Sequence, residues 1–221
     1  MSTNHDGGEN QNIPSRREAL LFRFKSSLLQ IRRRFNDATG PRVRKYSPGD
    51  ALAERPVIAE SKTLLWTETG PEERFLVAGK IQNLRLAVSE IDGVEIPAGE
   101  VFSFWKNVGR TTRGRGFVPG RELREGCIIP NIGGGLCQLS NALYDAALKA
   151  NFEIVERHAH TRVIAGSLAE QGRDATVFWN YVDLRFCSPQ PFRIETDSEK
   201  RASLRIDQMP FVSGCGEVLR R

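Results

Sequence analysis

Cys137 is the residue of this sequence whose neighbours point most clearly to chemistry. It follows a glycine turn of Gly133, Gly134 and Gly135. Its own segment has the apolar spacing of a helix over 136–150. Free amides at a helix start favour a thiolate, and glycines let amides approach a ligand without a Cβ in the way. We therefore expect Cys137 to be a nucleophile and the glycine turn to bind and stabilise an anion.

Two further side chains of the first helical turn are expected to contact a ligand. Gln138 and Ser140 follow Cys137 directly and offer polar groups beside the glycine turn. The turn has two other interpretations, namely a tight connection between packed elements and a site for a free anion or phosphate. Because it lacks the Gly-Lys-Ser/Thr ending of a P-loop, the sequence argues against nucleotide hydrolysis.

A thiol nucleophile needs a base, and few histidines are available. The chain has 3, and His5 lies in a polar tail, which leaves His158 and His160. These two are separated by one residue on a predicted strand, so both rings face the same side. Asp174, at the start of the next predicted strand, is expected to orient the imidazole, with Glu156 as the alternative.

A tetrahedral zinc site is the alternative use of these side chains. Its candidate ligands are Cys137, His158, His160 and either Asp174 or Cys127. None of the 4 cysteines belongs to a Cys-x-x-Cys pair, which argues against a zinc ribbon or a thioredoxin site. The expectation is therefore a protein without a cofactor, with zinc as the alternative.

Short alternating and aromatic segments around these residues predict the elements that position them. Strands are expected over 57–69, 127–129, 152–160, 174–186, 192–196 and 203–206, and a helix over 72–88. The fold class is therefore α+β, with a mainly antiparallel sheet packed on the central helix over 136–150 and an N-terminal amphipathic helix.

The first fifty residues differ from the rest in composition. Residues 1–14 predict a disordered tail, 15–50 a basic amphipathic helical arm with a linker, and 51–221 the α+β domain. The apolar residues of the arm are Leu20, Leu21, Phe24, Leu28, Ile31 and Phe35. We expect this stripe to dock on the domain, and peripheral contact with a membrane surface is the alternative.

The net charge of +5 is concentrated in the arm. Aromatic residues are not interleaved with the basic ones as a stacking platform requires, which argues against nucleic acid as a partner. The N-terminal residues lack the pattern of a secretory signal, and no apolar run approaches the roughly 20 residues of a membrane span. We therefore expect a cytoplasmic protein with reduced cysteines.

Five motifs occur in an order that is typical of one known family. They are Phe102-Ser103-Phe104-Trp105, the run from Gly133 through Cys137-Gln138-Leu139-Ser140 to Tyr144, His160, Asp174-Ala175-Thr176, and Tyr181-Val182-Asp183-Leu184. On these residues the chain resembles the VanW-like family, named for a protein of some vancomycin-resistance gene clusters. The similarity covers roughly residues 15–206. The resemblance implies a link to the cell envelope and favours His160 over His158, because the family pattern has one histidine.

Residues and resemblance together lead to two hypotheses. The first is an enzyme of acyl transfer or amide hydrolysis, with Cys137, His160 and Asp174 as catalytic residues. Its substrate would be a small molecule or cell-wall precursor of envelope or glycopeptide-resistance metabolism. The second is a non-catalytic accessory module that recognises an anionic ligand or glycan through the glycine turn and an arginine-rich loop over 110–121.

Overall fold

The computed structural model describes residues 16–39, 43–65, 70–124, 127–160, 168–197 and 201–208. Residues 1–14, for which the sequence predicts a disordered tail, lie outside the described residues, and so do residues 209–221. Helices and antiparallel sheets both occur in the described part, so the predicted α+β class is confirmed.

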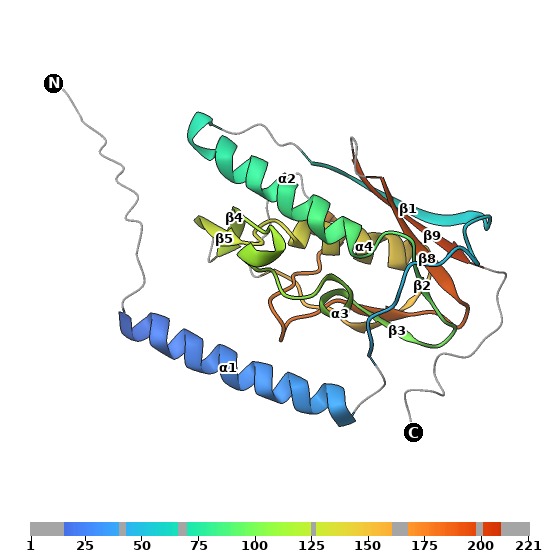
Figure 1. Cartoon of the computed structure of the whole chain (residues 1–221), viewed down its shortest axis with the longest axis horizontal. Helices are drawn as coiled ribbons and strands as arrows, with labels where there is room; N and C mark the ends of the chain where they lie inside the picture. Colours follow the sequence, from blue (N-terminus) through green and yellow to red (C-terminus); the bar gives the residue numbers. More distant parts are fainter. Residues whose placement is uncertain are drawn as a thin grey trace.

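Within the described residues the strands form three antiparallel units (Figure 1). The largest sheet has the order β1-β9-β8-β2, with strands Val57–Leu64, Arg201–Gln208, Phe192–Asp197 and Val94–Ile96. A second sheet has the order β3-β7-β6, with strands Val101–Ser103, Arg185–Cys187 and Glu153–Glu156. The third unit pairs β4, Pro119–Arg124, with β5, Cys127–Ile132.

The central helix that the sequence predicts is α4, Cys137–Lys149. Leu139, Leu143 and Ala146 recur at steps of three and four residues and are all buried, so they form its inner face. This helix packs against β1 and β9 of the large sheet and against β6 of the second sheet. The other described helices are α1, Arg16–Thr39; α2, Arg74–Ser89; α3, Phe104–Val108; and the 3-10 turns η1, Pro71–Glu73, η2, Arg113–Arg115, and η3, Leu168–Gln171.

Four phenylalanine rings join the two larger sheets. Phe102 of β3 stacks on Phe186 of β7 with ring centroids 4.8 Å apart. Phe152, just before β6, lies 4.7 Å from the ring of Phe192 in β8. Burying rings of this size stabilises a fold by about 1.5–3 kcal/mol each. The cluster therefore fixes the second sheet against the first.

The segment over 174–186 differs from its prediction as one continuous strand. The structure has irregular backbone there, with β7 only at its end and an isolated bridge between Phe178 and Val182. The amide of Ala175 donates to Asn141 Oδ1, and the amide of Asp183 donates to Glu156 Oε1. Because side-chain oxygens accept the hydrogen bonds of these two amides, the amides do not need partners in a neighbouring strand.

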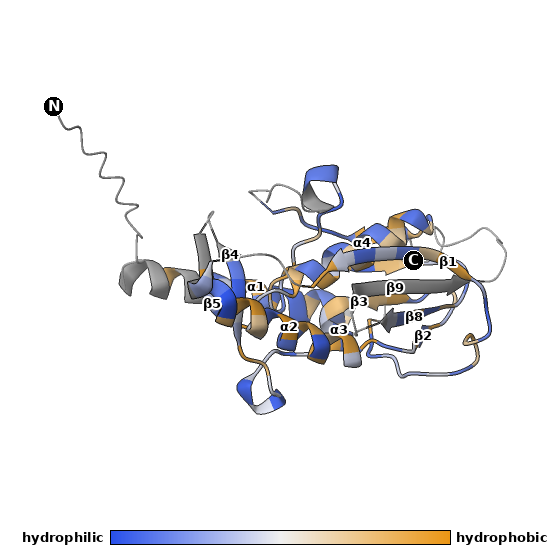
Figure 2. Cartoon of the chain, turned by 90° about the horizontal axis from the view of Figure 1, so that it is seen from above, coloured by the Kyte–Doolittle hydropathy of each residue, from blue (hydrophilic) through white to orange (hydrophobic). Residues whose placement is uncertain are grey.

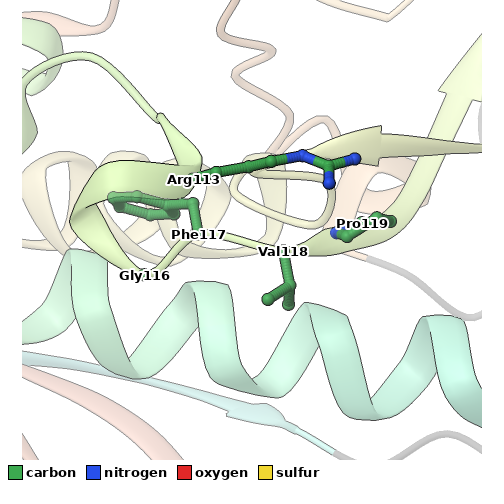
Figure 3. A pocket seen from close by; sticks show the side chains of 5 residues that line it. All are labelled: Arg113, Gly116, Phe117, Val118 and Pro119. Atoms are coloured by element: carbon green, nitrogen blue, oxygen red, sulfur yellow. The ribbon is translucent and has the colours of Figure 1, made fainter.

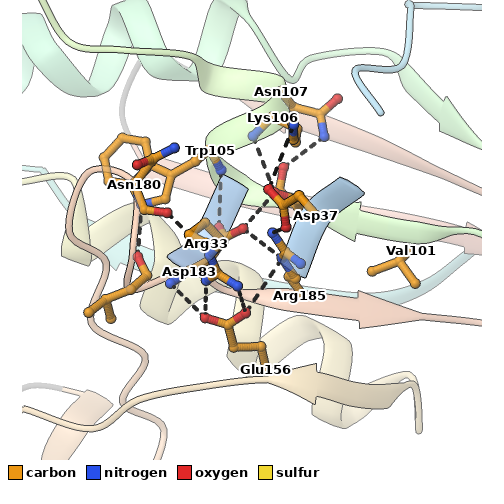
Figure 4. A network of polar contacts seen from close by, with 12 residues as sticks. Arg33, Asp37, Val101, Trp105, Lys106, Asn107, Glu156, Asn180, Asp183 and Arg185 are labelled. Atoms are coloured by element: carbon orange, nitrogen blue, oxygen red, sulfur yellow. Dashed lines mark hydrogen bonds and ion pairs between the residues drawn. The ribbon is translucent and has the colours of Figure 1, made fainter. Parts of the chain in front are cut away.

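The expected docking of the apolar stripe of α1 on the domain is wrong. Phe24, Leu28, Ile31 and Phe35 are all more than half exposed. The helix contacts the domain through its polar face instead, and Figure 4 shows the contacts of Arg33 and Asp37. Gln30 Nε2 donates to Trp179 O at 3.2 Å, Arg33 Nη1 donates to Glu156 Oε2 at 2.6 Å, and Arg185 Nη2 donates to Asp37 Oδ1 at 2.6 Å.

Among the helices of the described ranges, none is both long and apolar enough to cross a bilayer.

Three elements meet backbone to backbone in front of α4. A Cβ on Gly79 of α2 would lie 2.0 Å from the carbonyl oxygen of Pro119 in β4. A Cβ on Gly134 would lie 2.3 Å from the carbonyl oxygen of Gly120. Asn83 of α2 also donates from Nδ2 to the carbonyl of Gly134 at 3.0 Å. These contacts leave no room for side chains and set the position at which α4 begins.

This contact predicts the effect of one added methyl group. Gly134→Ala is expected to lower the free energy of unfolding by about 1–3 kcal/mol, because the new Cβ overpacks against a backbone atom. Gly114→Ala is the matched control, since a Cβ there meets nothing within 4 Å, and its effect should stay within about 0.5 kcal/mol. Urea unfolding measures both, and equal midpoints for the two variants would refute the close contact.

Candidate functional site

Cys137 is the first residue of α4 and is partly buried. Its Sγ lies 3.6 Å from Thr176 Oγ1 and 3.8 Å from the carbonyl oxygen of Val177. The segment over 174–177 therefore crosses the start of the helix, directly beside the thiol.

Hydrogen bonds from two sides hold this crossing segment. Ser140 Oγ donates to the carbonyl of Ala175 at 2.5 Å, and Asn141 Oδ1 accepts from the amide of the same residue at 2.8 Å. On the other side, the amide of Thr176 donates to the carbonyl of His158 at 2.8 Å. The segment is thus fixed between the first turns of α4 and the residues that follow β6.

His160 and Asp174 form a tightly coupled pair. His160 Nδ1 lies 2.6 Å from Asp174 Oδ1, and the backbone amide of His160 donates to the other carboxylate oxygen. Asp174 is buried, and the side chain of His160 is 19% exposed. Because both carboxylate oxygens bind one residue, the ring is held in a single orientation with Nδ1 facing the carboxylate.

The hydrogen bond with Asp174, followed by one with Cys137, raises the pKa of His160 to about 10, although burial acts in the opposite direction. Burial acts to raise the pKa of Asp174, but the hydrogen bonds and charge of His160 outweigh it, so that this pKa lies below its ordinary value. The imidazole is therefore positively charged at neutral pH, contacts the carboxylate through Nδ1, and is close enough to Cys137 for the thiol to raise its pKa. The structure brings together all three residues that the sequence predicts as catalytic.

The glycine turn requires a correction. The amides of Gly133 and Gly134 donate to the carbonyls of Val118 and Asn131, at 3.2 and 2.8 Å, so neither is available to an anion. In the described part of the chain, no hydrogen bond from the amide of Gly135, Leu136 or Cys137 occurs. Of the three predicted amides, that of Gly135 therefore remains available to an anion, together with those of Leu136 and Cys137 at the helix start.

Gln138 and Ser140 also differ from their predicted role as ligand contacts. Gln138 Nε2 donates to Thr63 Oγ1 at 2.9 Å and to the carbonyl of Leu64 at 2.6 Å, which ties α4 to β1. Ser140 is fully buried and its hydroxyl holds the crossing segment, so it cannot touch a ligand. Both residues position the site.

Two residues that the sequence analysis missed lie at this site. Asn141 holds the backbone of Ala175, and it belongs to the same motif as Cys137, so its place in that motif was the available signal. Lys80 of α2 is buried next to the glycine turn. It lies three residues after Val77 and four before Leu84, on the inner face of the helix. A lysine at the helical spacing of buried apolar residues was the available signal in the sequence.

The zinc alternative requires both histidines beside Cys137. His158 is half exposed, and its Nε2 lies 3.5 Å from Glu156 Oε1. Across the residues with described side chains, no three His, Cys, Asp or Glu groups gather as metal ligands. The side chain of Cys127, the other candidate ligand, lies outside the described residues.

Comparisons with known proteins identify relatives of the chain. A family model described as "VanW like protein" matches residues 79–207, which include every residue of the site. The chain is 38% identical over 104 residues to the uncharacterized protein YoaR of Bacillus subtilis, covering 47% of this chain and 34% of that protein. It is 25% identical over 173 residues to the vancomycin B-type resistance protein VanW of Enterococcus faecalis, covering 74% of this chain and 62% of that protein.

The chain therefore spans about a third of the first relative, of which 34% is covered, and less than two thirds of the second, of which 62% is covered. No solved structure matches the chain significantly.

The coupling of His160 to Asp174 predicts a pH dependence of stability. Between the ordinary histidine pKa of 6.5 and the folded value of about 10, the folded chain binds more protons than the unfolded chain. The contribution of His160 is therefore complete below pH 6.5 and is lost as pH rises towards 10. Urea unfolding of the wild type and of His160→Gln should show a difference in the free energy of unfolding that shrinks over this range.

The control for that experiment is His158→Gln, because this ring is half exposed and lies two residues away. Its effect on the free energy of unfolding should be small at every pH. A stability difference for His160→Gln that does not change between pH 6 and 10 would contradict the raised pKa.

Proposed function

The chain belongs to the VanW-like family, and from that premise we propose that it is an enzyme with Cys137 as its nucleophile. The proposed reaction is acyl transfer or amide hydrolysis. The observation that carries the proposal is the His160 imidazole, which is held at Nδ1 by a buried carboxylate and whose pKa is raised by that carboxylate and by Cys137. A charged imidazole beside a thiolate at a helix start is the arrangement that activates a cysteine for attack on a carbonyl.

The proton of the thiol resides on His160 at the start of the proposed reaction. The sulfur attacks the carbonyl carbon of the substrate, a C–S bond forms, and the carbonyl oxygen becomes negative. As the tetrahedral intermediate collapses, His160 gives its proton to the leaving amine or alcohol and the C–N or C–O bond breaks. His160 then takes a proton from water or from an acceptor hydroxyl or amine, which attacks the thioester and releases Cys137.

Two other groups have defined roles in this scheme. Asp174 holds the ring in one orientation and stabilises its positive charge through the 2.6 Å contact with Nδ1. The amides at the start of α4, those of Leu136 and Cys137, stabilise the oxyanion. Removing one such donor in other enzymes costs about 10²–10³ in rate.

The substrate class is proposed from the name of one relative. The Enterococcus faecalis protein is called a vancomycin B-type resistance protein. For this chain we take from that name a substrate among cell-wall precursors, whose amide and ester bonds suit a thiol nucleophile. Since a thiol nucleophile persists in a reducing compartment, we place the reaction in the cytoplasm.

The rival function is a binding module that uses the glycine turn and the arginine-rich loop. That loop has a pocket of about 240 Å³, lined by Arg113, Gly116, Phe117, Val118 and Pro119 (Figure 3). Ligand pockets usually measure roughly 300–1,000 Å³, so this one is small for the role. Arg115 is already bound to Glu90 at 2.6 Å, and two amides of the turn are occupied. These observations favour the enzyme.

Alkylation by iodoacetamide, read by peptide mass spectrometry, tests the proposed nucleophile. Cys137 is expected to react at pH 6 much faster than Cys187, which is buried. His160→Ala should slow the reaction of Cys137 at this pH by about tenfold or more, because the charged partner of the thiolate is removed.

His158→Ala serves as the control, since it removes a histidine two residues away that is half exposed. It should leave the alkylation rate of Cys137 unchanged. A rate at Cys137 that is the same in the wild type and in His160→Ala would refute the nucleophile and favour the binding module.

A further inference from the structure

Lys80 is a buried charged residue that the proposed reaction does not use. It lies on the inner face of α2 and is only 6% exposed. No hydrogen bond or ion pair of its ammonium group occurs among the described residues. Lysine is almost never buried without a partner, because removing its charge from water is costly. An anion supplied from outside the chain would balance this charge.

The stem of Lys80 packs against the glycine turn that precedes α4. A Cβ on Gly135 would lie 2.2 Å from Lys80 Cγ and 3.2 Å from Cδ, so the lysine occupies the space that any other side chain would fill. Gly135 also has a φ of +100°, which favours glycine. Gly135 is two residues before Cys137 in the chain, so the lysine stem packs against the backbone that leads into the candidate nucleophile.

The surrounding charges leave Lys80 unbalanced. Burial lowers its pKa to about 8, and the charge of nearby Arg121 acts in the same direction. Arg121 itself has a counter-ion, since its Nη2 lies 3.2 Å from Glu73 Oε2. Lys80 therefore stays mostly protonated at neutral pH and adds to the positive field of the free amides at the helix start.

We propose that Lys80 binds a carboxylate of the substrate at the start of α4, beside Cys137. The inference rests on the proposed function and specifies its substrate class as acyl compounds that carry a carboxylate near the scissile bond. A carboxylate fits better than a phosphate, because one ammonium group balances its single charge, whereas a phosphate monoester carries about −1.5 to −2.

Two alkylating reagents of nearly equal size test this site on the full chain. Iodoacetate carries a carboxylate and iodoacetamide does not. The ratio of the Cys137 alkylation rate with iodoacetate to that with iodoacetamide should fall by about tenfold in Lys80→Met, because the charge-assisted contact is lost. Lys149→Met is the matched control, since it removes the same charge from the far end of α4 and should not change the ratio.

An equal ratio in the wild type and Lys80→Met would overturn the carboxylate site. A second measurement uses the wild type alone and so avoids any folding defect of the variant. Acetate should slow iodoacetamide alkylation of Cys137 saturably, while chloride at the same ionic strength should not, and equal effects would also overturn the site. Failure of the proposed function gives a different result. In that case iodoacetamide alkylates Cys137 slowly in the wild type, whether or not the iodoacetate-to-iodoacetamide ratio depends on Lys80.

The exposed stripe of α1 carries a second inference independently. Leu21, Phe24, Leu28, Ile31 and Phe35 are 59–71% exposed. Figure 2 shows hydrophobic residues on α1 next to hydrophilic ones. With 3.6 residues per turn, these five positions lie opposite 30, 33 and 37, which contact the domain. The stripe therefore points away from the domain.

The charges of α1 indicate what covers the stripe. The helix contains 7 basic and 2 acidic residues, and one of the acids, Asp37, is bound by Arg185. Lys25, Arg32 and Arg34 are exposed. An exposed apolar stripe beside basic residues matches an anionic bilayer surface, in which the apolar side chains enter the acyl boundary and the basic ones meet headgroups. We infer that α1 binds the surface of an anionic membrane.

Co-sedimentation of the full chain with lipid vesicles tests this inference. The chain should sediment with vesicles of phosphatidylcholine and phosphatidylglycerol, and much less with phosphatidylcholine alone. The double variant Phe24→Gln, Phe35→Gln should weaken sedimentation by about tenfold or more. Phe75→Gln is the matched control, because this phenylalanine of α2 is 86% exposed outside the stripe and should not matter.

Two results would overturn the membrane inference. The first is the same weak sedimentation with both kinds of vesicle. The second is a dimer in sedimentation velocity that the double variant dissociates, because the stripe would then be covered by a second copy of the chain.

Discussion

The contact between Gly120 and Gly134 is the constraint on which the site depends. Their backbones approach so closely that a Cβ on either would lie within 2.5 Å of the other's carbonyl oxygen. Asn83 of α2 bonds the same carbonyl of Gly134, so α2, β4 and the start of α4 form one unit. Because backbone atoms have no rotamers, the contact places Cys137 more firmly than side-chain packing would. The stem of Lys80 packs against the same turn at Gly135.

The second half of the site comes from irregular backbone. His160 follows β6, and Asp174 opens a segment in which the amides of Ala175 and Asp183 bond to side chains rather than to a strand. A regular ladder would fix these residues at the spacing of a sheet. The irregular path instead lets one carboxylate take both the ring and the amide of His160, while Thr176 and Val177 reach the sulfur.

The sequence predicted the parts of this site that depend on residue type. Cysteine and histidine are rare in this chain, and Cys137, His160 and Asp174 all belong to the family motifs. Few other residues could take their places, so their association could be predicted. Which amides of the turn stay free could not be predicted from the sequence. The carbonyls of Val118 and Asn131 accept from Gly133 and Gly134, and only the folded turn brings these carbonyls near. The docking of α1 failed for a related reason. Its apolar spacing was read correctly as a stripe, but the buried acceptors that bind Arg33 and Gln30 lie more than a hundred residues away.

The most direct measurement of the central claim is a magnetic-resonance titration of the His160 ring in the isotope-labelled full chain. The ring is expected to remain protonated through neutral pH, with a pKa of about 10 that falls when Cys137 is replaced by alanine. Asp174→Asn should lower the same pKa further, since the carboxylate is the larger influence. A His160 pKa near the ordinary 6.5 in the wild type, unchanged by either substitution, would contradict the coupling of sulfur, imidazole and carboxylate on which the account rests.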